Sequence, residues 1–575
     1  MLTVPQRNSL WPASIYSALL LAAGFLAYGA TGHDDAHINF WSAYTLLEHG
    51  QFLNYNGERI EQTTNLLQDI LTAILHLVSR MDLVTCGFLV DIMSAFACIM
   101  LGIALVRRTS SMTYWISTML CSSSSFMLWS FGGMGATLAA FCLLATIYVW
   151  DIWIDSTAPN LKLKCLLLST CLALTLERPE MPLIAIALAC WMLALNITNT
   201  EKRKRCLQLL ALSLSATVLL FGWQQLYFSS WLPVPALAKQ GGSLHDKLQL
   251  GYIYIVFNSV LNPVVVVSLL LLPCYWWQQH RNPASNKNRR TLFCLLSGAT
   301  FIYLGFIWAA GGDWMQAGRF FVPILPTTSL LLVMTLGNLP SRWATHITLA
   351  VLCSLQALQQ YITTIPKLSH GIPAWTQFHI ADQHQRYSLF EKLNQEHLRD
   401  MGVIDHLAQI IPGLHTKLNR PVILMSGQAG MVFYYTAREF GNDVQFRDLR
   451  GLVEDSLTRC PVTADIRKGS QGIFWGYREF FALLPQLQAA CGIAPPDLIY
   501  DINDMTQKLG KTLEPYGYTL IHSETGFLIE NSTALPYNRL LSPNMIFIRN
   551  ELLPLLDHQE KIIIDYNRLP LQSRF

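Results

Sequence analysis

Long apolar runs recur along the first two thirds of the chain and stop near residue 362. A helix needs about 20 apolar residues to cross the hydrocarbon core of a bilayer, so runs of this length predict membrane-spanning helices. The shorter apolar stretch 66–78 is interrupted by Gln68 and Asp69, which favours an interfacial or re-entrant helix there. We expect about eleven spans, centred near residues 22, 94, 121, 144, 170, 188, 216, 264, 300, 329 and 352.

The rest of the chain has a different pattern, in which short apolar segments alternate with helical periodicity. Residues 422–425 run into the turn Ser426-Gly-Gln-Ala-Gly430 and a helical pattern, and 497–500 and 545–548 are further predicted strands. The turn lacks the Lys-Ser/Thr pair of a P-loop, so we interpret it as a tight backbone turn, with phosphate binding as the alternative. We predict an α-helical polytopic membrane domain over 1–365 and a soluble α/β domain over 366–575.

Composition agrees with this division, since 52% of the 575 residues are hydrophobic and only 13% are charged. A soluble domain carries about a quarter charged residues. The formal net charge of +3 is close to neutral, so nucleic acid is not an expected partner. Membrane lipids are expected partners because of the predicted spans. The first apolar run lacks a small-residue cleavage site, which predicts a retained helix and not a signal peptide.

Basic residues cluster in alternate connections, and this sets the expected orientation. By the positive-inside rule these connections and the N-terminus are cytoplasmic, and an odd number of spans places the C-terminal domain outside. Cys460 and Cys491 of that domain would be able to form a disulfide in an oxidising compartment, and two unpaired buried thiols explain them equally well. The basic clusters include Arg107-Arg108, 201–205 and 281–290.

The remaining connections carry the unusual polar motifs, and this topology puts all of them on the outer face. Acid- and base-bearing turns on one side of the membrane indicate the wall of a single site at the outer interface. The motifs are His33-Asp34-Asp35-Ala-His37, Glu177-Arg178-Pro179-Glu180, Leu232-Pro-Val-Pro-Ala-Leu-Ala-Lys239, and Gly311-Gly-Asp313-Trp314 followed by Arg319.

Asp34 and Asp35 follow the first apolar run closely. Neighbouring side chains on a helix or turn point about 100° apart, so the two carboxylates are not expected to share one proton. We expect one to act as general base on an acceptor hydroxyl and the other to hold substrate or to shift the pKa of its neighbour. Capping of the following helix is the alternative for one of the two. Which aspartate is the base stays open at this stage.

His33 and His37 stand four residues apart, a spacing that suits a metal ion on one helix face. Without a second dedicated cluster of ligands, we interpret them as solvated or hydrogen-bonding side chains. We therefore assign no metal ligands and leave a divalent cation open as a cofactor.

Three cations recur beside the acidic turns. Arg178 stands before Pro179, at the expected start of a span, where the helix N-terminus and the guanidinium together favour an anion. Lys239 and Arg319 add positive charge on the same face. Snorkelling to the headgroups explains a single cation of this kind, whereas three of them predict a phosphate-bearing ligand such as a lipid phosphate.

The order of these motifs resembles the GT-C polytopic glycosyltransferases related to the terminal arabinofuranosyltransferase of mycobacterial cell-wall arabinan. The resemblance runs from the first span into the C-terminal domain. It is carried by Asp34-Asp35-Ala, Gly57-Glu-Arg59-Ile-Glu61-Gln-Thr-Thr64-Asn65, Arg178-Pro-Glu180, Leu232-Pro-x-x-x-x-Ala-Lys239, Gly311-Gly-Asp313-Trp-x-x-x-x-Arg319-Phe-x-x-Pro323, Gly427-Gln-Ala-Gly430 and Asp448-Leu-Arg-Gly451-Leu.

The resemblance implies an inverting transferase that moves a sugar, arabinofuranose as the first guess, from a polyprenyl-phosphate donor. The acceptor would be an envelope glycan, a lipopolysaccharide sugar or a protein at the periplasmic face of a bacterial cytoplasmic membrane. Asp34 or Asp35 would be the general base, and Arg178, Lys239 and Arg319 would hold the donor phosphate. The substrate pocket would comprise Glu61, Asn65, Glu180, Asp313 and Trp314, with His33 and His37 in support.

The chain departs from the family pattern in three places, and these departures weaken any transfer of sugar or acceptor identity. The arginines that usually follow the Asp pair are Trp41 and Tyr44, the acidic position in the turn 132–136 is Gly135, and a Gly-Tyr-Thr-Asn element reads Gln62-Thr-Thr-Asn65. A transporter or flippase of lipid-linked sugars is the alternative function, and a non-catalytic envelope scaffold is a third.

Overall fold

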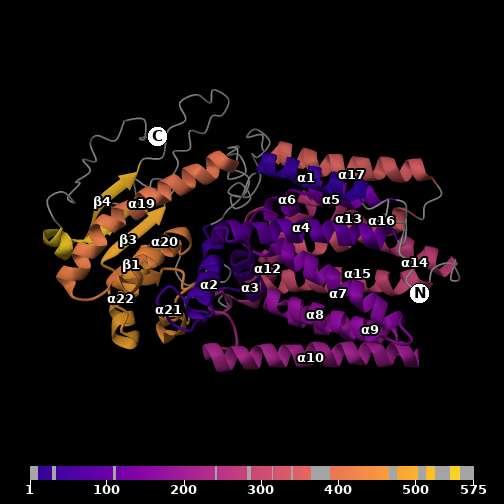
Figure 1. Ribbon diagram of the computed structural model, residues 1–575, viewed down its shortest axis with the longest axis horizontal. Coiled ribbons are helices and arrows are strands. Elements are labelled where there is room, and N and C mark those ends of the chain that lie inside the picture. The colour runs from indigo at the N-terminus through magenta and orange to yellow at the C-terminus, as the bar shows by residue number, and fades with distance from the viewer. Residues whose placement is uncertain are drawn as a thin grey trace. The chain divides into compact units, whose positions relative to one another are not determined.

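The computed structural model describes residues 11–28, 34–107, 112–239, 243–281, 287–313, 315–337, 341–363, 389–464, 476–502, 513–524 and 544–556 (Figure 1). The chain divides into two compact units. Unit 1 comprises Met1–Gly32, Asn65–Trp231 and Ser243–Phe390, and unit 2 comprises His33–Thr64, Leu232–Gly242 and Glu391–Phe575. Each unit thus combines segments that are far apart in the sequence. The predicted domain boundary at residue 365 stays a prediction.

Helices are the regular secondary structure of unit 1 in its described residues, and turns connect them. Helices satisfy every backbone hydrogen bond within one segment, which an apolar chain in lipid requires. The helices are α1 (Trp11–Tyr28), α3 (Leu66–Ser79), α4 (Leu83–Arg107), α5 (Thr113–Ser122), α6 (Ser124–Trp129), α7 (Ala136–Asp155), α8 (Leu161–Glu177), α9 (Met181–Leu195), α10 (Thr200–Phe228), α12 (Leu244–Leu261), α13 (Pro263–Leu270), α14 (Leu272–Arg281), α15 (Lys287–Ala310), η2 (Gln316–Ile324), α16 (Leu325–Leu336) and α17 (Arg342–Thr363).

Each predicted span centre lies within one of these helices. Among the described residues, five helices are long and apolar enough to cross a membrane, and the pair α12 and α13, bent by 98°, would make a sixth. The apolar part of α1, α3 and α9 are shorter apolar helices. With 14 residues, α3 is about 21 Å long, too short for a hydrocarbon core of about 30 Å. This length agrees with the interfacial or re-entrant helix expected over 66–78.

Burial separates the interior helices of unit 1 from its peripheral ones. In the most apolar window of α7, 78% of the residues are buried, whereas in that of α10 only 33% are. Leu219 and Leu226 of α10 are 70% and 87% exposed. Continuous exposed apolar surface of this kind requires a lipid environment. The chain is therefore a multi-pass membrane protein with a C-terminal α/β domain, as the sequence predicted.

The sheet in unit 2 has the strand order β2-β1-β3-β5-β4. The predicted strands are confirmed as β1 (Val422–Ser426), β3 (Leu498–Ile502) and β5 (Asn544–Arg549), and two further strands, β2 (Val444–Asp448) and β4 (Tyr518–Glu524), were not predicted. The pairs β1–β2 and β1–β3 are parallel, and β5 joins β3 and β4 antiparallel. All five residues of β1 are buried, as expected of a parallel strand that is covered on both faces.

Helices and short turns complete unit 2. The helix α2 and the short α11 come from early segments of the chain, and the others belong to the C-terminal segment. They are α2 (Ala36–His49), α11 (Val234–Ala238), α19 (Leu389–Leu418), α20 (Met431–Phe440), η4 (Gly441–Asp443), α21 (Asp455–Arg459), η5 (Pro461–Thr463), α22 (Tyr477–Cys491), η7 (Glu514–Tyr516) and η8 (Asn550–Leu555).

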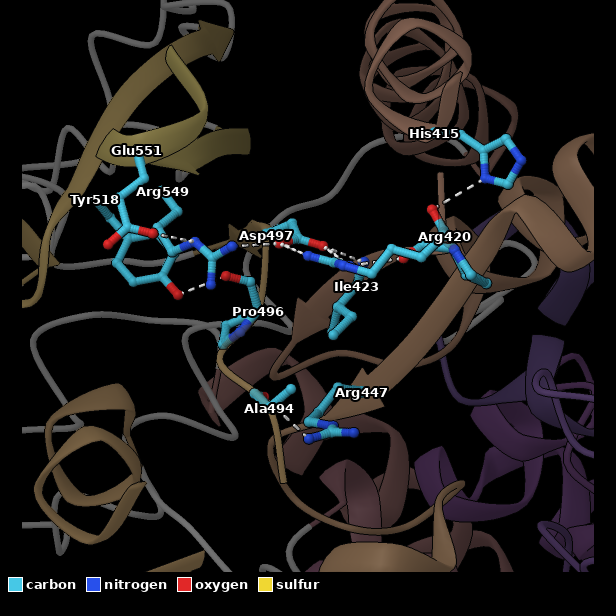
Figure 2. Close-up of polar contacts among 11 residues, drawn as sticks. His415, Arg420, Ile423, Arg447, Ala494, Pro496, Asp497, Tyr518, Arg549 and Glu551 are labelled. Atoms are coloured by element: carbon cyan, nitrogen blue, oxygen red, sulfur yellow. Dashed lines mark hydrogen bonds and ion pairs between the residues drawn. The ribbon is translucent and has the colours of Figure 1, made fainter. Parts of the chain in front are cut away.

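Asp497, which directly precedes β3, joins three segments of unit 2 (Figure 2). Arg420 donates to its carboxylate through Nη1 at 2.6 Å and Nη2 at 2.8 Å. Arg549 Nη2 donates at 3.0 Å, and so does the backbone N–H of Ile423. Asp497 is fully buried, and two guanidinium groups offset the cost of burying its charge.

Cys460 and Cys491 form a disulfide with their Cα atoms 5.9 Å apart. The bond links the residue before η5 to the last residue of α22. Of the two interpretations that the sequence left open, the structure shows the paired one.

Candidate functional site

The loop that carries Asp34 and Asp35 is part of unit 2, and Asp34 is attached to the C-terminal segment. Its Oδ2 accepts the backbone N–H of Gly430 at 2.9 Å, and its Oδ1 accepts that of Met431 at 2.6 Å. These two amides stand at the N-terminus of α20, where the first N–H groups of a helix have no partner inside the helix. Asp34 therefore caps a helix that begins almost 400 residues later in the sequence.

Gly430 is required at this junction because the backbone of Asp34 passes directly beside it. A Cβ atom on residue 430 would lie 1.8 Å from the carbonyl oxygen of Asp34. The Gly-rich turn 427–430 is thus a close-approach turn, in agreement with its interpretation as a backbone turn. The anion at this helix N-terminus is the carboxylate of Asp34.

Asp35 takes the N-cap position of α2, but its side chain makes no capping hydrogen bond to that helix. We expected one of the two aspartates to cap the helix that follows them. The structure instead shows the side chain of Asp34 capping a distant helix, α20. The backbone carbonyls of Asp34 and Asp35 accept the N–H groups of His37 and Ile38 at 3.0 and 3.2 Å. The turn 34–35 is thereby continuous with the first turn of α2.

The residues after α2 extend the core of the α/β domain. The side chain of Asn56 pairs with the edge strand β2: its Nδ2 donates to the carbonyl of Phe446 at 3.0 Å, and its Oδ1 accepts the N–H of Phe446 at 2.7 Å. Tyr55 is buried, and its hydroxyl donates to the carbonyls of His37 and Gly430, both at 3.4 Å. Burial, with Asp34 as the next cause, raises the pKa of Tyr55 well above its ordinary value, so the phenol keeps the proton that it donates.

Glu61 and Lys239 belong to the same unit. The carbonyl of Glu61 accepts the N–H of Val234 at 3.0 Å, which attaches the segment of α11 to the Asp34 loop. Glu61 is buried, and Lys239 follows the end of α11 with its side chain half-buried. Unit 2 thus gathers the acid pair, Glu61 and one of the three predicted phosphate ligands.

His37 is buried in an aromatic cluster of unit 2. Its ring lies 5.3 Å from that of Phe40 and 5.6 Å from that of Tyr434, measured between centroids, in edge-on arrangements. His33 lies outside the described residues. Within the described part of the chain, no group of three or more His, Cys, Asp or Glu side chains could hold a metal ion. His37 packs here as an aromatic side chain against α20.

Unit 1 brings the two predicted arginines together around Phe320. The Arg178 and Arg319 guanidinium groups lie 5.2 and 5.6 Å from the centroid of the Phe320 ring. Arg178 Nε donates to Glu180 at 2.5 Å, and Arg319 Nε donates to Asp313 at 2.8 Å. All four charged side chains are largely buried. The predicted ligands Arg178, Arg319, Glu180 and Asp313 therefore form one charged cluster, whereas Trp314 lies outside the described residues.

Asn65, the last of the predicted pocket residues, lies at a second polar cluster of unit 1. Its Nδ2 donates to the carbonyl of Met134 at 2.5 Å, in the glycine-rich turn before α7. Gly135 of this turn has a φ of +72°, and a Cβ there would lie 2.6 Å from Glu177 Oε1 and 2.8 Å from Asn65 Nδ2. The glycine that departs from the family pattern is required by both its backbone conformation and its neighbours.

Sequence reasoning assigned no role to two carboxylates at this turn, although it named one of them, Glu177, as part of a polar motif. Asp91 of α4 is fully buried, and its Oδ2 accepts the N–H groups of Met134 and Gly135 at 2.9 and 3.3 Å. Glu177 is also fully buried, and among the described residues neither of its carboxylate oxygens has a hydrogen-bond partner. A signal for Asp91 was present, because an acidic residue within a predicted span marks a polar partner inside the bundle.

The chains of solved structures that are similar to this chain include two of one protein, ArnT. No protein-family model matches this chain, and no curated protein matches it. ArnT from Cupriavidus metallidurans bound to undecaprenyl phosphate is similar with a TM-score of 0.48 and 10% identity, over 94% of this chain and 98% of that one. The same protein in the apo state gives a TM-score of 0.46, with the same identity and coverage. No residue role is carried over from either structure.

Proposed function

We propose that this protein is an inverting GT-C-type glycosyltransferase that uses a polyprenyl-phosphate-linked sugar as donor. The sugar of the proposal is arabinofuranose, and the acceptor is a hydroxyl of an envelope glycan, lipid or protein. The proposal rests on the motif order in the sequence and on one structural observation: the acid pair follows the first predicted span, and its first member, Asp34, is hydrogen-bonded to the α/β domain. A transport path needs no acid pair anchored to a folded domain outside the membrane.

Two observations in unit 2 support the proposed location at the outer face. The segments 33–64 and 232–242 share one compact unit with the C-terminal segment, and in the predicted topology each of them follows an odd-numbered span. Segments that pack together must lie on the same side of the membrane. The disulfide between Cys460 and Cys491 is typical of an oxidising compartment, such as the periplasm.

The chemistry proposed for these residues is a direct displacement at the anomeric carbon. A carboxylate of the acid pair takes the proton of the acceptor hydroxyl, and the acceptor oxygen forms a bond to the anomeric carbon. The bond from that carbon to the phosphate oxygen breaks, and its electron pair leaves with the polyprenyl phosphate. Arg178 and Arg319 would stabilise the departing phosphate through their terminal nitrogens, with Lys239 as a third cation.

The test is transfer by purified protein in liposomes that contain a synthetic polyprenyl-phosphate arabinofuranose. We expect release of polyprenyl phosphate and a pentose on the acceptor, and loss of both in the double variant Asp34→Asn/Asp35→Asn. The matched control is Asp443→Asn, because Asp443 is an exposed aspartate of the same unit. Full activity of the double variant contradicts the proposed role of the pair. Donor movement across the bilayer without any transfer indicates a flippase instead.

Mass spectrometry of the envelope identifies the sugar. Glycans and glycoproteins from cells with and without the protein are compared. Loss of a pentose supports arabinofuranose as the sugar, and loss of a hexose overturns that part of the proposal.

A further inference from the structure

We propose that the two aspartates have separate roles: Asp34 is a positioning residue anchored to the N-terminus of α20, and Asp35 is the general base. This division rests on the proposed glycosyl transfer and deepens it. It also gives a role to the backbone amides of Gly430 and Met431, which hold the carboxylate of Asp34.

Both carboxylate oxygens of Asp34 are engaged by backbone donors. The two bonds, 2.9 Å to Gly430 and 2.6 Å to Met431, place the negative charge at the positive end of a helix dipole. Hydrogen bonds to a charged acceptor are the stronger kind. An acceptor hydroxyl approaching Asp34 would have to compete with two amides that cannot turn away, since both are fixed by α20.

The same junction also holds the backbone of Asp34. The carbonyl of Asp34 accepts the N–H of His37 at 3.0 Å and passes so close to Gly430 that a Cβ there would meet it. Tyr55 bridges the two helix starts through its bonds to the carbonyls of His37 and Gly430. The first turn of α2 and the first turn of α20 are therefore one assembly, and Asp34 is its central contact.

Asp35 is the next residue, and its place is set by this anchor. It takes the N-cap position of α2, with helical backbone angles of −59° and −21°, and neighbouring side chains on a helical turn point about 100° apart. With Asp34 committed to α20, the proton of the acceptor hydroxyl goes to the Asp35 carboxylate as the acceptor oxygen bonds to the anomeric carbon. Asp34 changes no bond in the reaction and acts by holding Asp35 still.

Kinetics of single variants separate the two roles. Asp35→Asn should lower kcat by about 10²–10⁴-fold with little change in KM, because a neutral amide binds the acceptor but takes no proton. Asp34→Ala should lower kcat less, by about tenfold, and Asp34→Asn should recover part of that loss, because its single amide oxygen keeps one of the two hydrogen bonds to the start of α20. Asp443→Asn is the control for an aspartate-to-asparagine change in the same unit.

Hydrogen exchange measures the anchor without any transfer reaction. Amide exchange at the start of α20 should accelerate in Asp34→Ala and stay at the wild-type rate in Asp35→Asn. Gly430→Ala, which displaces Asp34 from the opposite side, should reproduce the exchange pattern of Asp34→Ala. This measurement also identifies any variant that has lost its fold.

The outcomes distinguish failure of the inference from failure of the proposed function. If Asp34→Asn abolishes transfer while Asp35→Asn keeps it, the assignment of the base is reversed and the transferase proposal stands. If exchange at α20 is unchanged in Asp34→Ala, the anchor is overturned. If the wild-type protein transfers no sugar, the proposed function fails, and the assignment of Asp35 as base fails with it. The exchange data then still decide whether Asp34 anchors α20.

Discussion

The start of α7 in unit 1 and the start of α20 in unit 2 use the same local device in two different settings. Each helix comes after a glycine-containing turn, and each receives the carboxylate of an aspartate from a distant part of the chain. Asp91 accepts the N–H groups of Met134 and Gly135, and Asp34 accepts those of Gly430 and Met431. At α20 the aspartate bonds the amides of the N-cap and of the first helical residue, whereas at α7 it bonds those of Met134 and of the N-cap Gly135, just before the helix begins.

The settings differ in burial and in the residue next to each aspartate. Asp91 is fully buried within α4, where water cannot replace it, so its loss should destabilise unit 1. Asp34 is half-buried at the start of a helix, and a second carboxylate, that of Asp35, comes directly after it. The interaction of Asp91 therefore contributes to stability, whereas in our proposal that of Asp34 positions the reacting carboxylate of Asp35.

A third carboxylate, Asp497, has a purely structural role, and its removal should cause the largest loss of stability. Asp497→Ala should destabilise the α/β domain by about 3–5 kcal/mol, because Arg420 and Arg549 keep their charges without the partner that offset them. Urea unfolding of the protein, followed through limited proteolysis of the C-terminal domain, measures the change. The exposed Asp443→Ala, which should cost less than about 0.5 kcal/mol, is the control, and an equal loss in both contradicts the interpretation of Figure 2.

Asp91 should contribute more than Asp34 to stability, and Asp34 should contribute more than Asp91 to transfer activity. Asp91→Ala leaves two buried amides without partners and should cost about 3 kcal/mol, whereas Asp34→Ala removes a half-exposed cap and should cost about 1 kcal/mol. Transfer activity per folded molecule should fall only in Asp34→Ala. Thermal unfolding in detergent measures the loss of stability in each variant, and the liposome assay measures the loss of transfer. If the same variant is the more affected in both assays, the proposed difference between Asp91 and Asp34 is contradicted.

Substitution of Gly135, in the turn that Asp91 contacts, and of Gly430, beside Asp34, tests the same difference between the two aspartates. Gly135→Ala should cost about 1–2 kcal/mol, because its φ of +72° is unfavourable for a residue with a side chain. At Gly430 the penalty arises from displacement of Asp34, so Gly430→Ala and Asp34→Ala should be non-additive when combined. A double-mutant cycle on unfolding free energy and kcat measures the coupling. Full additivity would show that the two changes act on separate contacts.

The stability of the α/β domain should also depend on pH, because it contains a carboxylate that burial favours in its neutral form. Burial raises the pKa of Glu454 to about 7, against an opposing effect of Arg447. The folded state then binds more protons than the unfolded state between pH 4.5 and 7, so stability should fall as pH rises through this window. The slope is at most about 1.4 kcal/mol per pH unit. Unfolding of Glu454→Gln should lose this part of the pH dependence, and an unchanged slope would assign it to other groups.

Prediction from the sequence succeeded where an element is defined by its own residues. The centres of the spans, the short helix over 66–78 and three strands can be derived from apolar runs and their length, because hydrophobic burial and backbone hydrogen bonding are local demands. The strands β2 and β4 were missed because their residues mix polar and apolar types, and only pairing with β1 and β5 makes them strands.

The candidate site was predictable as a list of residue types and not as a set of contacts. Three cations beside acidic turns predicted one phosphate site; Arg178 and Arg319 do meet at Phe320, and Lys239 belongs to unit 2. The roles of Asp91 and Glu177 were not predictable, since nothing near them in sequence shows which helix end or glycine they face. Asp34 was recognised as unusual, but its partner lies 396 residues away.

The sequence by itself determined the class of molecule, because about eleven long apolar runs cannot be buried in a soluble core and a charged C-terminal segment cannot enter lipid. It also determined which charged residues lie at a membrane boundary, where burial of their charge is unfavourable unless water, protein or a ligand compensates it. Only the tertiary structure decided that the loop after the first predicted span belongs to the α/β domain, that Cys460 and Cys491 are paired, and that Asp34 holds the start of α20. These contacts join residues far apart in sequence, and chain folding alone creates them.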